Sequence, residues 1–177
     1  MEAKPQAELN LVHSGPRPEG FDVEHFAYEE LESAKRSLQD EGYLTAIAWL
    51  IAPTQIEVYA LGFHNPEQKC EVYRRLVERA WEIKAELIIT LNDIRYVEKP
   101  GGAEYYPGMT SHPGRVSFEG AKEAILVTIS GPDRSTKELR AEYTRVGDKL
   151  VFAATEECRD VTVGMLGTWS KEVRSIQ

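Results

Sequence analysis

The residues best suited to catalysis lie in the stretch TSHPGRVSFEGA, residues 110–121. His112 could serve there as a general base, acting with Asp93 or with Ser117. Such a dyad requires the side chains to come within about 3 Å of each other. The chain has no G-x-S-x-G motif, which would present a serine nucleophile at a strand-to-helix turn. A small hydrolase with its site around His112 is therefore one hypothesis.

The same stretch resembles the signature of the JAB/MPN-type zinc isopeptidases. That signature places two histidines around a Ser or Thr, then a Pro and a downstream Ser-x-x-Asp, so that three ligands hold zinc and leave a position for water. His112-Pro113-Gly114 matches the second half of the signature. However, Thr110 stands at the position of the first histidine, and Gly120 stands at the position of the aspartate. We therefore expect no metal and no other cofactor.

The segment 92–121 as a whole favours binding over catalysis. Its prolines and glycines leave no periodic element, and a loop of this length in a compact domain is usually functional or disordered. Tyrosine and arginine are common anchors of binding surfaces. The alternative, that the tyrosines only cover the sheet, remains open. The candidate binding residues are Asp93, Arg95, Tyr96, Tyr105, Tyr106, His112 and Arg115.

The composition excludes several classes of partner. With 42% hydrophobic and 28% charged residues, the chain has the composition of a globular protein. Its formal net charge of −8 disfavours binding to nucleic-acid phosphates or to an anionic membrane surface. No apolar stretch approaches the roughly 18 residues of a membrane span, and the first residues lack the apolar core of a signal peptide. We expect a cytoplasmic protein that binds neither nucleic acid nor membrane.

Two helices are marked by capping residues. The first is expected from Asp22, a good N-cap, to the residue before Gly42, which favours the left-handed conformation that ends a helix. The second follows Asn65, which forms an N-x-x-Q capping box with Gln68. The helical spacing of the second places Cys70 on the core face. Both Cys70 and Cys158 are expected to be free and mostly buried thiols.

Six stretches have the composition of strands. YLTAIAWLI and EAILVTIS are apolar at consecutive positions, which indicates strands covered on both faces. In KELRAEYTR, polar and apolar residues alternate, so one face is expected to meet water. QIEVYALGF, ELIITL and KLVF complete the set, and VTVGMLGTW in the tail could add one more.

These elements predict an α+β fold. The expected order is α-β-β-α-β-loop-β-β-β, with two helices on one face of a mostly antiparallel sheet of five to seven strands. If the third strand neighbours the second, the helix between them makes a right-handed crossover. Residues 1–20 are expected to form a flexible N-terminal arm, with Leu9, Leu11 and Val12 able to add a short edge strand. Residues 21–177 would then form a single α+β domain.

The order α-β-β-α-β followed by further strands resembles that of roadblock-type dimerisation domains. This resemblance implies self-association and binding of partners, including small GTPases, without catalysis, although the segment 92–121 departs from it. GYLTAIAWLI, ELIITLNDIRYV and KEAILVTIS also resemble stretches of short bacterial proteins of unassigned function, which implies no chemistry. We expect a non-catalytic module that forms a homodimer and binds a protein partner or a small ligand through residues 92–121.

Overall fold

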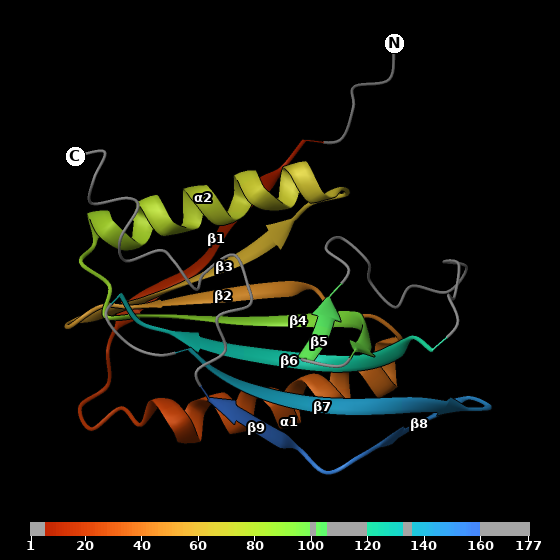
Figure 1. Cartoon of the computed structure of the whole chain (residues 1–177). Helices are drawn as coiled ribbons and strands as arrows, with labels where there is room; N and C mark the ends of the chain where they lie inside the picture. The colour runs from red at the N-terminus through yellow and green to blue at the C-terminus, as the bar shows by residue number, and fades with distance from the viewer. Residues whose placement is uncertain (1–5, 100–101, 106–119, 133–135, 160–177) are drawn as a thin grey trace.

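Nine strands form one antiparallel sheet, and two helices pack against it (Figure 1). The computed structural model describes residues 6–99, 102–105, 120–132 and 136–159. The helices are α1 (Val23–Glu41) and α2 (Pro66–Glu82). The strands are β1 (Glu8–Pro16), β2 (Ala46–Ile51), β3 (Gln55–Gly62), β4 (Leu87–Lys99), β5 (Gly102–Tyr105), β6 (Lys122–Ser130), β7 (Lys137–Val146), β8 (Lys149–Phe152) and β9 (Glu156–Arg159).

The expected α+β class, with two helices and an antiparallel sheet, is confirmed, but the sheet has more strands than expected. Its order is β1-β3-β2-β4-β6-β7-β8, while β5 pairs with β4 and β9 pairs with β7. Because β2 lies between β3 and β4, the helix α2 does not connect neighbouring strands, and the condition stated for a crossover between neighbours is not met. The segment VTVGMLGTW lies outside the described residues.

The helix α1 begins and ends at its predicted residues, and α2 begins directly after its predicted cap. The Asp22 side chain accepts a hydrogen bond from a backbone N–H of the first turn of α1, and Gly42 ends the helix with a φ of 80°. The Asn65 side chain accepts from the Gln68 N–H at 2.8 Å, and the Gln68 side chain accepts from the His64 N–H at 2.9 Å. The Asn65 half of the predicted capping box is therefore formed, and the return bond of Gln68 goes to the N–H of His64, the residue before the N-cap.

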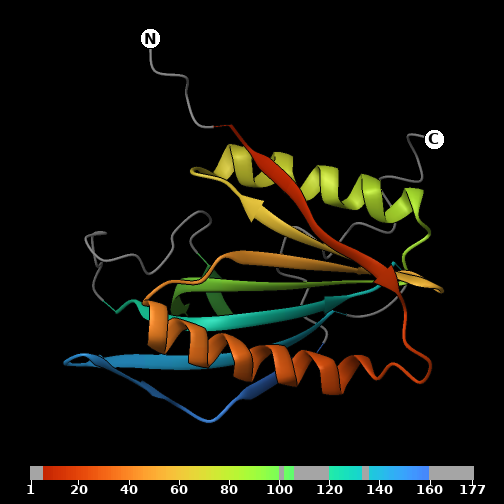
Figure 2. The ribbon, with the colours of Figure 1, turned by 180° about the vertical axis from the view of Figure 1, so that it is seen from behind.

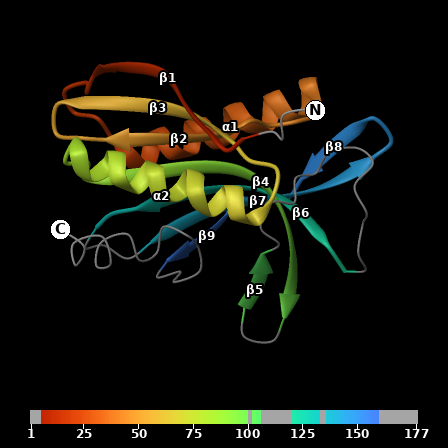
Figure 3. The ribbon, with the colours of Figure 1, turned by 90° about the horizontal axis from the view of Figure 1, so that it is seen from above.

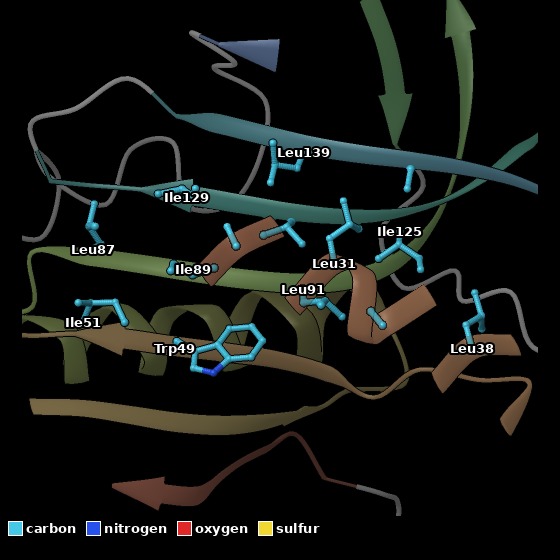
Figure 4. Close-up of a cluster of buried hydrophobic side chains, with 14 of the residues drawn as sticks. Leu31, Leu38, Trp49, Ile51, Leu87, Ile89, Leu91, Ile125, Ile129 and Leu139 are labelled. Atoms are coloured by element: carbon cyan, nitrogen blue, oxygen red, sulfur yellow. The ribbon is translucent and has the colours of Figure 1, made fainter. Parts of the chain in front are cut away.

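The two helices cover opposite faces of the sheet, so the prediction of helices on one face is wrong (Figure 1). On the α1 side, Trp49 and Ile51 of β2 join the helix in one core cluster, drawn in Figure 4. On the α2 side, Ala48 and Leu50 of the same strand join the second cluster. A strand that is apolar on both faces needs cover on both, because exposed apolar area is unfavourable in water. Neither described helix is long and apolar enough to cross a membrane.

Residues 8–16 form an edge strand rather than a flexible arm. β1 pairs antiparallel with β3 through eight of its nine residues, with a bulge between Leu11 and His13 (Figure 2). Leu9 packs against the α2-side core, which holds the strand in register. Beyond β1, Arg17 donates to the Glu86 carboxylate at 2.8 Å. The suggested edge strand is therefore present, and it is as long as the central strand β6.

The segment 92–121 begins as a strand and not as a loop. β4 runs for thirteen residues to Lys99 and pairs with β6 as far as Tyr96, opposite Lys122. Beyond that point β4 pairs with β5, and the two project away from the rest of the sheet (Figure 3). The polar residues at 92, 93 and 95 can lie in a strand because neighbouring strands satisfy their backbone groups. Residues 100–101 and 106–119 are outside the described chain.

Cys70 is exposed, so its predicted place on the core face is wrong. At 100° per residue, the centre of the buried stripe formed by Tyr73, Leu76 and Ala80 passes through Lys69, one position before the cysteine. The Lys69 ammonium lies 5.7 Å from the centroid of the Tyr73 ring. Burial lowers the pKa of Lys69 because the charged form is desolvated. Cys158 is half-buried rather than buried.

Candidate functional site

Three of the predicted binding residues lie on one strand, near the end of the sheet where β4, β6 and β7 run side by side. Asp93, Arg95 and Tyr96 all belong to β4 and are buried. Tyr105 belongs to β5, where its backbone pairs with that of Tyr96. Tyr106, His112 and Arg115 lie outside the described residues, as does Ser117. The geometry required by a hydrolase around His112 therefore also falls outside them.

The structure does not bring the three residues of β4 to one face. Alternate residues of a strand point to opposite sides, so Asp93 and Arg95 share the α1 side with Leu91. Tyr96 points to the α2 side, where it forms a small cluster with apolar side chains of β4 and β6. The sheet end therefore carries two polar groups back to back.

On the α1 side, a buried tyrosine holds a buried carboxylate. The Tyr143 hydroxyl donates to Asp93 Oδ1 at 2.8 Å, and the two residues are 3% and 9% exposed. The Arg145 guanidinium lies 5.7 Å from the centroid of the Tyr143 ring. A carboxylate removed from water needs such donors, because its desolvation is otherwise costly. This bond joins β4 to β7 across the intervening strand β6.

Next to this pair, one carboxylate lies between two guanidinium groups. Arg95 Nη2 is 3.3 Å from Glu123 Oε1, and Arg145 Nε is 3.4 Å from Glu123 Oε2. Together with Asp93, the group has two positive and two negative charges on three strands. Because these charges pair with each other, the group is suited to holding β4, β6 and β7 together and not to general acid–base chemistry.

On the α2 side, Tyr96 is fully buried and interacts with charged residues of β7. Its hydroxyl donates to the Glu142 carboxylate, and the Arg140 guanidinium lies 4.9 Å from the centroid of its ring. Lys122 also pairs with Glu142, at 3.5 Å. The polar face of β7 was expected to meet water, but Glu138 on this face is only 3% exposed. The alternation of residue types along the strand does not predict this burial.

Sequence reasoning missed the exposed apolar residues at this end of the sheet. β7 and β8 form a hairpin that extends beyond the start of β6, diverging from β4 and β5 (Figure 3). Its register places four exposed side chains on the α2 side, and we call them the hairpin patch: Thr144, Val146, Lys149 and Val151. Val146 and Val151 are 62% and 54% exposed. The signal was present, since Val146 interrupts the polar positions of an alternating strand.

A second buried ion pair lies in another part of the fold, between β3 and α2. Glu57 is 4% exposed, and Arg79 donates to both of its oxygens, at 2.6 and 3.0 Å. These hydrogen bonds lower the pKa of Glu57, while burial and the nearby carboxylate raise the pKa of Tyr59 to about 12. At neutral pH the carboxylate is therefore charged and the phenol protonated, so neither group is poised to exchange protons.

The described residues contain no group of three His, Cys, Asp or Glu side chains that could hold a metal ion. Their histidines lie apart, on β1, at the start of α1 and before α2. His25 pairs with Glu29 at 3.1 Å on the exposed face of α1. These positions fit surface histidines and do not assemble a site.

The bond between Tyr143 and Asp93 makes a testable contribution to stability. We expect Tyr143→Phe to lower the free energy of unfolding by about 1–3 kcal/mol, because it removes a donor from a buried carboxylate. Urea denaturation monitored by circular dichroism would measure the change. Tyr28→Phe is the matched control, since Tyr28 donates to Glu157 at 3.1 Å but is 38% exposed. Equal losses of unfolding free energy in the two variants would show that the buried hydrogen bond contributes no more to stability than the exposed one.

The function of this sheet end has to be inferred from its own geometry. Comparison of the chain with protein-family models, with curated proteins and with solved structures finds no match. This end of the sheet holds one group of paired polar side chains on each face, and the hairpin patch lies further along β7.

Proposed function

We propose that the chain is a non-catalytic binding module that binds a protein partner at this sheet end. The observation that carries the proposal is the hairpin patch, in which Val146 and Val151 are both more than half exposed on one face of the hairpin. Diagonal neighbours on adjacent antiparallel strands are close enough to act as one contact surface. Grouped apolar side chains with charged neighbours are typical of protein-binding surfaces.

The polar groups at the base of the hairpin support binding more than catalysis. The Asp93 carboxylate accepts from Tyr143, and Glu123 pairs with two arginines. These contacts join β4, β6 and β7, so they hold the base of the β7–β8 hairpin in place. A rigid surface loses less conformational entropy when it binds, which raises affinity for a given contact area.

The β4–β5 pair leaves the same end of the sheet in a different direction from the hairpin (Figure 3). It leaves the sheet at Tyr96, beside the first residue of β6, and it contains Tyr105 from the predicted binding set. We assign the binding role to the hairpin patch, and the role expected for the segment 92–121 stays a prediction. A small ligand, the second kind of partner expected from the sequence, is an alternative that the experiment below distinguishes.

Selection of random displayed peptides on the immobilised protein would test the proposal. We expect enriched peptides to bind the wild-type chain and to lose at least about tenfold in affinity with Val146→Lys/Val151→Lys, because lysines place charge in the apolar contact. The matched control is Ser33→Lys/Thr45→Lys, which adds the same charge at two other exposed positions. Isothermal titration calorimetry with the enriched peptides would measure each affinity.

Two results would count against the proposal. One is failure of any peptide to enrich on the wild-type chain, which would leave a small ligand as the better candidate. The other is equal loss of affinity in the hairpin variant and in the control variant, which would attribute the loss to net charge. Circular dichroism spectra of both variants should match the wild type, because all four positions are exposed.

A further inference from the structure

The two edges of the sheet differ in how well they are protected against pairing with another strand. The far edge consists of β8 and β9, two strands of four residues each, separated by residues 153–155. It carries Lys149, Glu156, Glu157 and Arg159. Short, interrupted and charged edges are the usual means by which proteins prevent intermolecular pairing. This edge is therefore protected.

The β1 edge lacks most of these features. It is nine residues long, and its sequence ELNLVHSGP contains one carboxylate and neither Lys nor Arg. Leu11 and Val12 near its centre are 55% and 65% exposed. The bulge at Val12 is a feature that can hinder pairing, but it also turns an additional apolar side chain outward.

The outer side of β1 also presents backbone N–H and C=O groups that could pair with another strand. β3 pairs with its inner side, and no other described strand pairs with it, as Figure 2 shows. About half of the N–H and C=O groups of an edge strand point away from the sheet. At about 3.4 Å per residue, this row extends over roughly 30 Å.

We propose that two copies of the chain pair through β1, with the strands antiparallel about a two-fold axis near Leu11 and Val12. The sheet would then continue from one copy into the other, and the exposed apolar side chains would meet at the axis. A two-fold contact uses the same surface on both copies and therefore closes with two. This proposal does not depend on the hairpin patch, which lies at the other end of the strand order.

The charges along β1 favour a second copy in the antiparallel direction. The carboxylate of Glu8 lies at the start of the strand, whereas the guanidinium of Arg17, which also pairs with Glu86, lies beyond its end. Antiparallel pairing brings the acidic start of one strand close to the basic end of the other. Parallel pairing would place like charges side by side, which is unfavourable.

The size of the contact sets the expected affinity. Stable interfaces bury about 1,200–2,000 Å² in total, and one pair of edge strands lies at or below the low end of that range. We therefore expect a dissociation constant of about 1–100 µM. Sedimentation velocity or light scattering from about 5 to 500 µM would span this transition.

Substitutions on the two edges distinguish this dimer from other modes of association. Leu11→Lys/Val12→Lys should raise the dissociation constant at least about tenfold, because it places four lysines around the axis. Val151→Lys on the far edge should leave it unchanged, although Val151 has nearly the exposure of Leu11, 54% against 55%. A wild-type chain that stays monomeric at about 500 µM would overturn the proposal. So would a dimer that Val151→Lys disrupts and Leu11→Lys/Val12→Lys does not.

Cysteine cross-linking would test the geometry independently, in a Cys70→Ser/Cys158→Ser background. A disulfide requires Cα atoms within about 7 Å, so it reports residues that face each other near the axis. Leu11→Cys or Val12→Cys should form a covalent dimer under mild oxidation, while Val151→Cys should stay monomeric. Absence of cross-linking at both β1 positions, or equal cross-linking at Val151, would contradict the proposed pairing. A failed peptide selection would leave this result intact.

Discussion

Replacing Leu31 with alanine is expected to lower the free energy of unfolding by about 3–4 kcal/mol. Leu31 is fully buried at the middle of α1, in the cluster that joins the helix to β2, β4, β6 and β7 (Figure 4). The loss combines the transfer of the removed methyl groups with the cavity left among strands that cannot close around it. Since domains are stable by about 5–15 kcal/mol, this is a large fraction of the total.

Urea denaturation followed by tryptophan fluorescence would measure this loss. Trp49 is 6% exposed in the same cluster, so its emission reports the loss of this packing. The control Val151→Ala removes apolar atoms from an exposed strand position and should change stability by less than about 0.5 kcal/mol. A loss of less than about 1 kcal/mol for Leu31→Ala would mean that α1 contributes little to the core.

Replacing Arg79 with alanine is the second change with a large expected effect. It should lower the free energy of unfolding by about 2–4 kcal/mol at pH 7, because Glu57 would remain buried without the guanidinium that donates to both its oxygens. The estimate lies below the range for fully buried pairs because the Arg79 side chain is 38% exposed. Arg74→Ala is the control, since Arg74 pairs with Glu71 on the exposed face of the same helix. Its loss should stay below about 1 kcal/mol.

The pH dependence of this effect has a definite sign. Hydrogen bonds from Arg79 lower the pKa of Glu57 below its ordinary value of 4.5. A carboxylate with a lowered pKa contributes stability that is present above 4.5 and is lost as the pH falls through the folded-state pKa. The difference between the wild type and Arg79→Ala should therefore shrink as the pH falls below 4.5, and urea denaturation across that range would measure it. A difference that stays constant would contradict the assignment.

The sequence was sufficient to predict the local features of the fold. The two ends of α1 and the start of α2 follow from Asp22, Gly42 and Asn65, whose hydrogen bonds join residues three or four positions apart. The continuous apolar run of β2 correctly predicted a strand covered on both faces. That run also argued against two helices on one face, because one covered face would leave half of its apolar residues in water.

The candidate site was predicted only in part. Asp93, Arg95 and Tyr96 lie at the sheet end that the structure singles out, but strand alternation places them on opposite faces. Their partners Tyr143 and Glu142 come from β7, about fifty residues later in the chain. The exposed Val146 and Val151 meet on one face only through the β7–β8 register. The residue types could be identified in the sequence, but the contacts between β4 and β7 and the register of β7 with β8 could not.

Features that depend on residues close together in the sequence were determined by the sequence itself. Features that depend on contacts between distant segments were decided only by the tertiary structure. Caps, turns and the apolar pattern of each element depend on neighbours within one or two turns, so residue order is enough to identify them. The extension of β4 past residue 92 and the edge position of β1 depend on which distant strand lies alongside. Backbone groups of a strand are satisfied by its neighbours in the sheet, and a chain read residue by residue does not identify them.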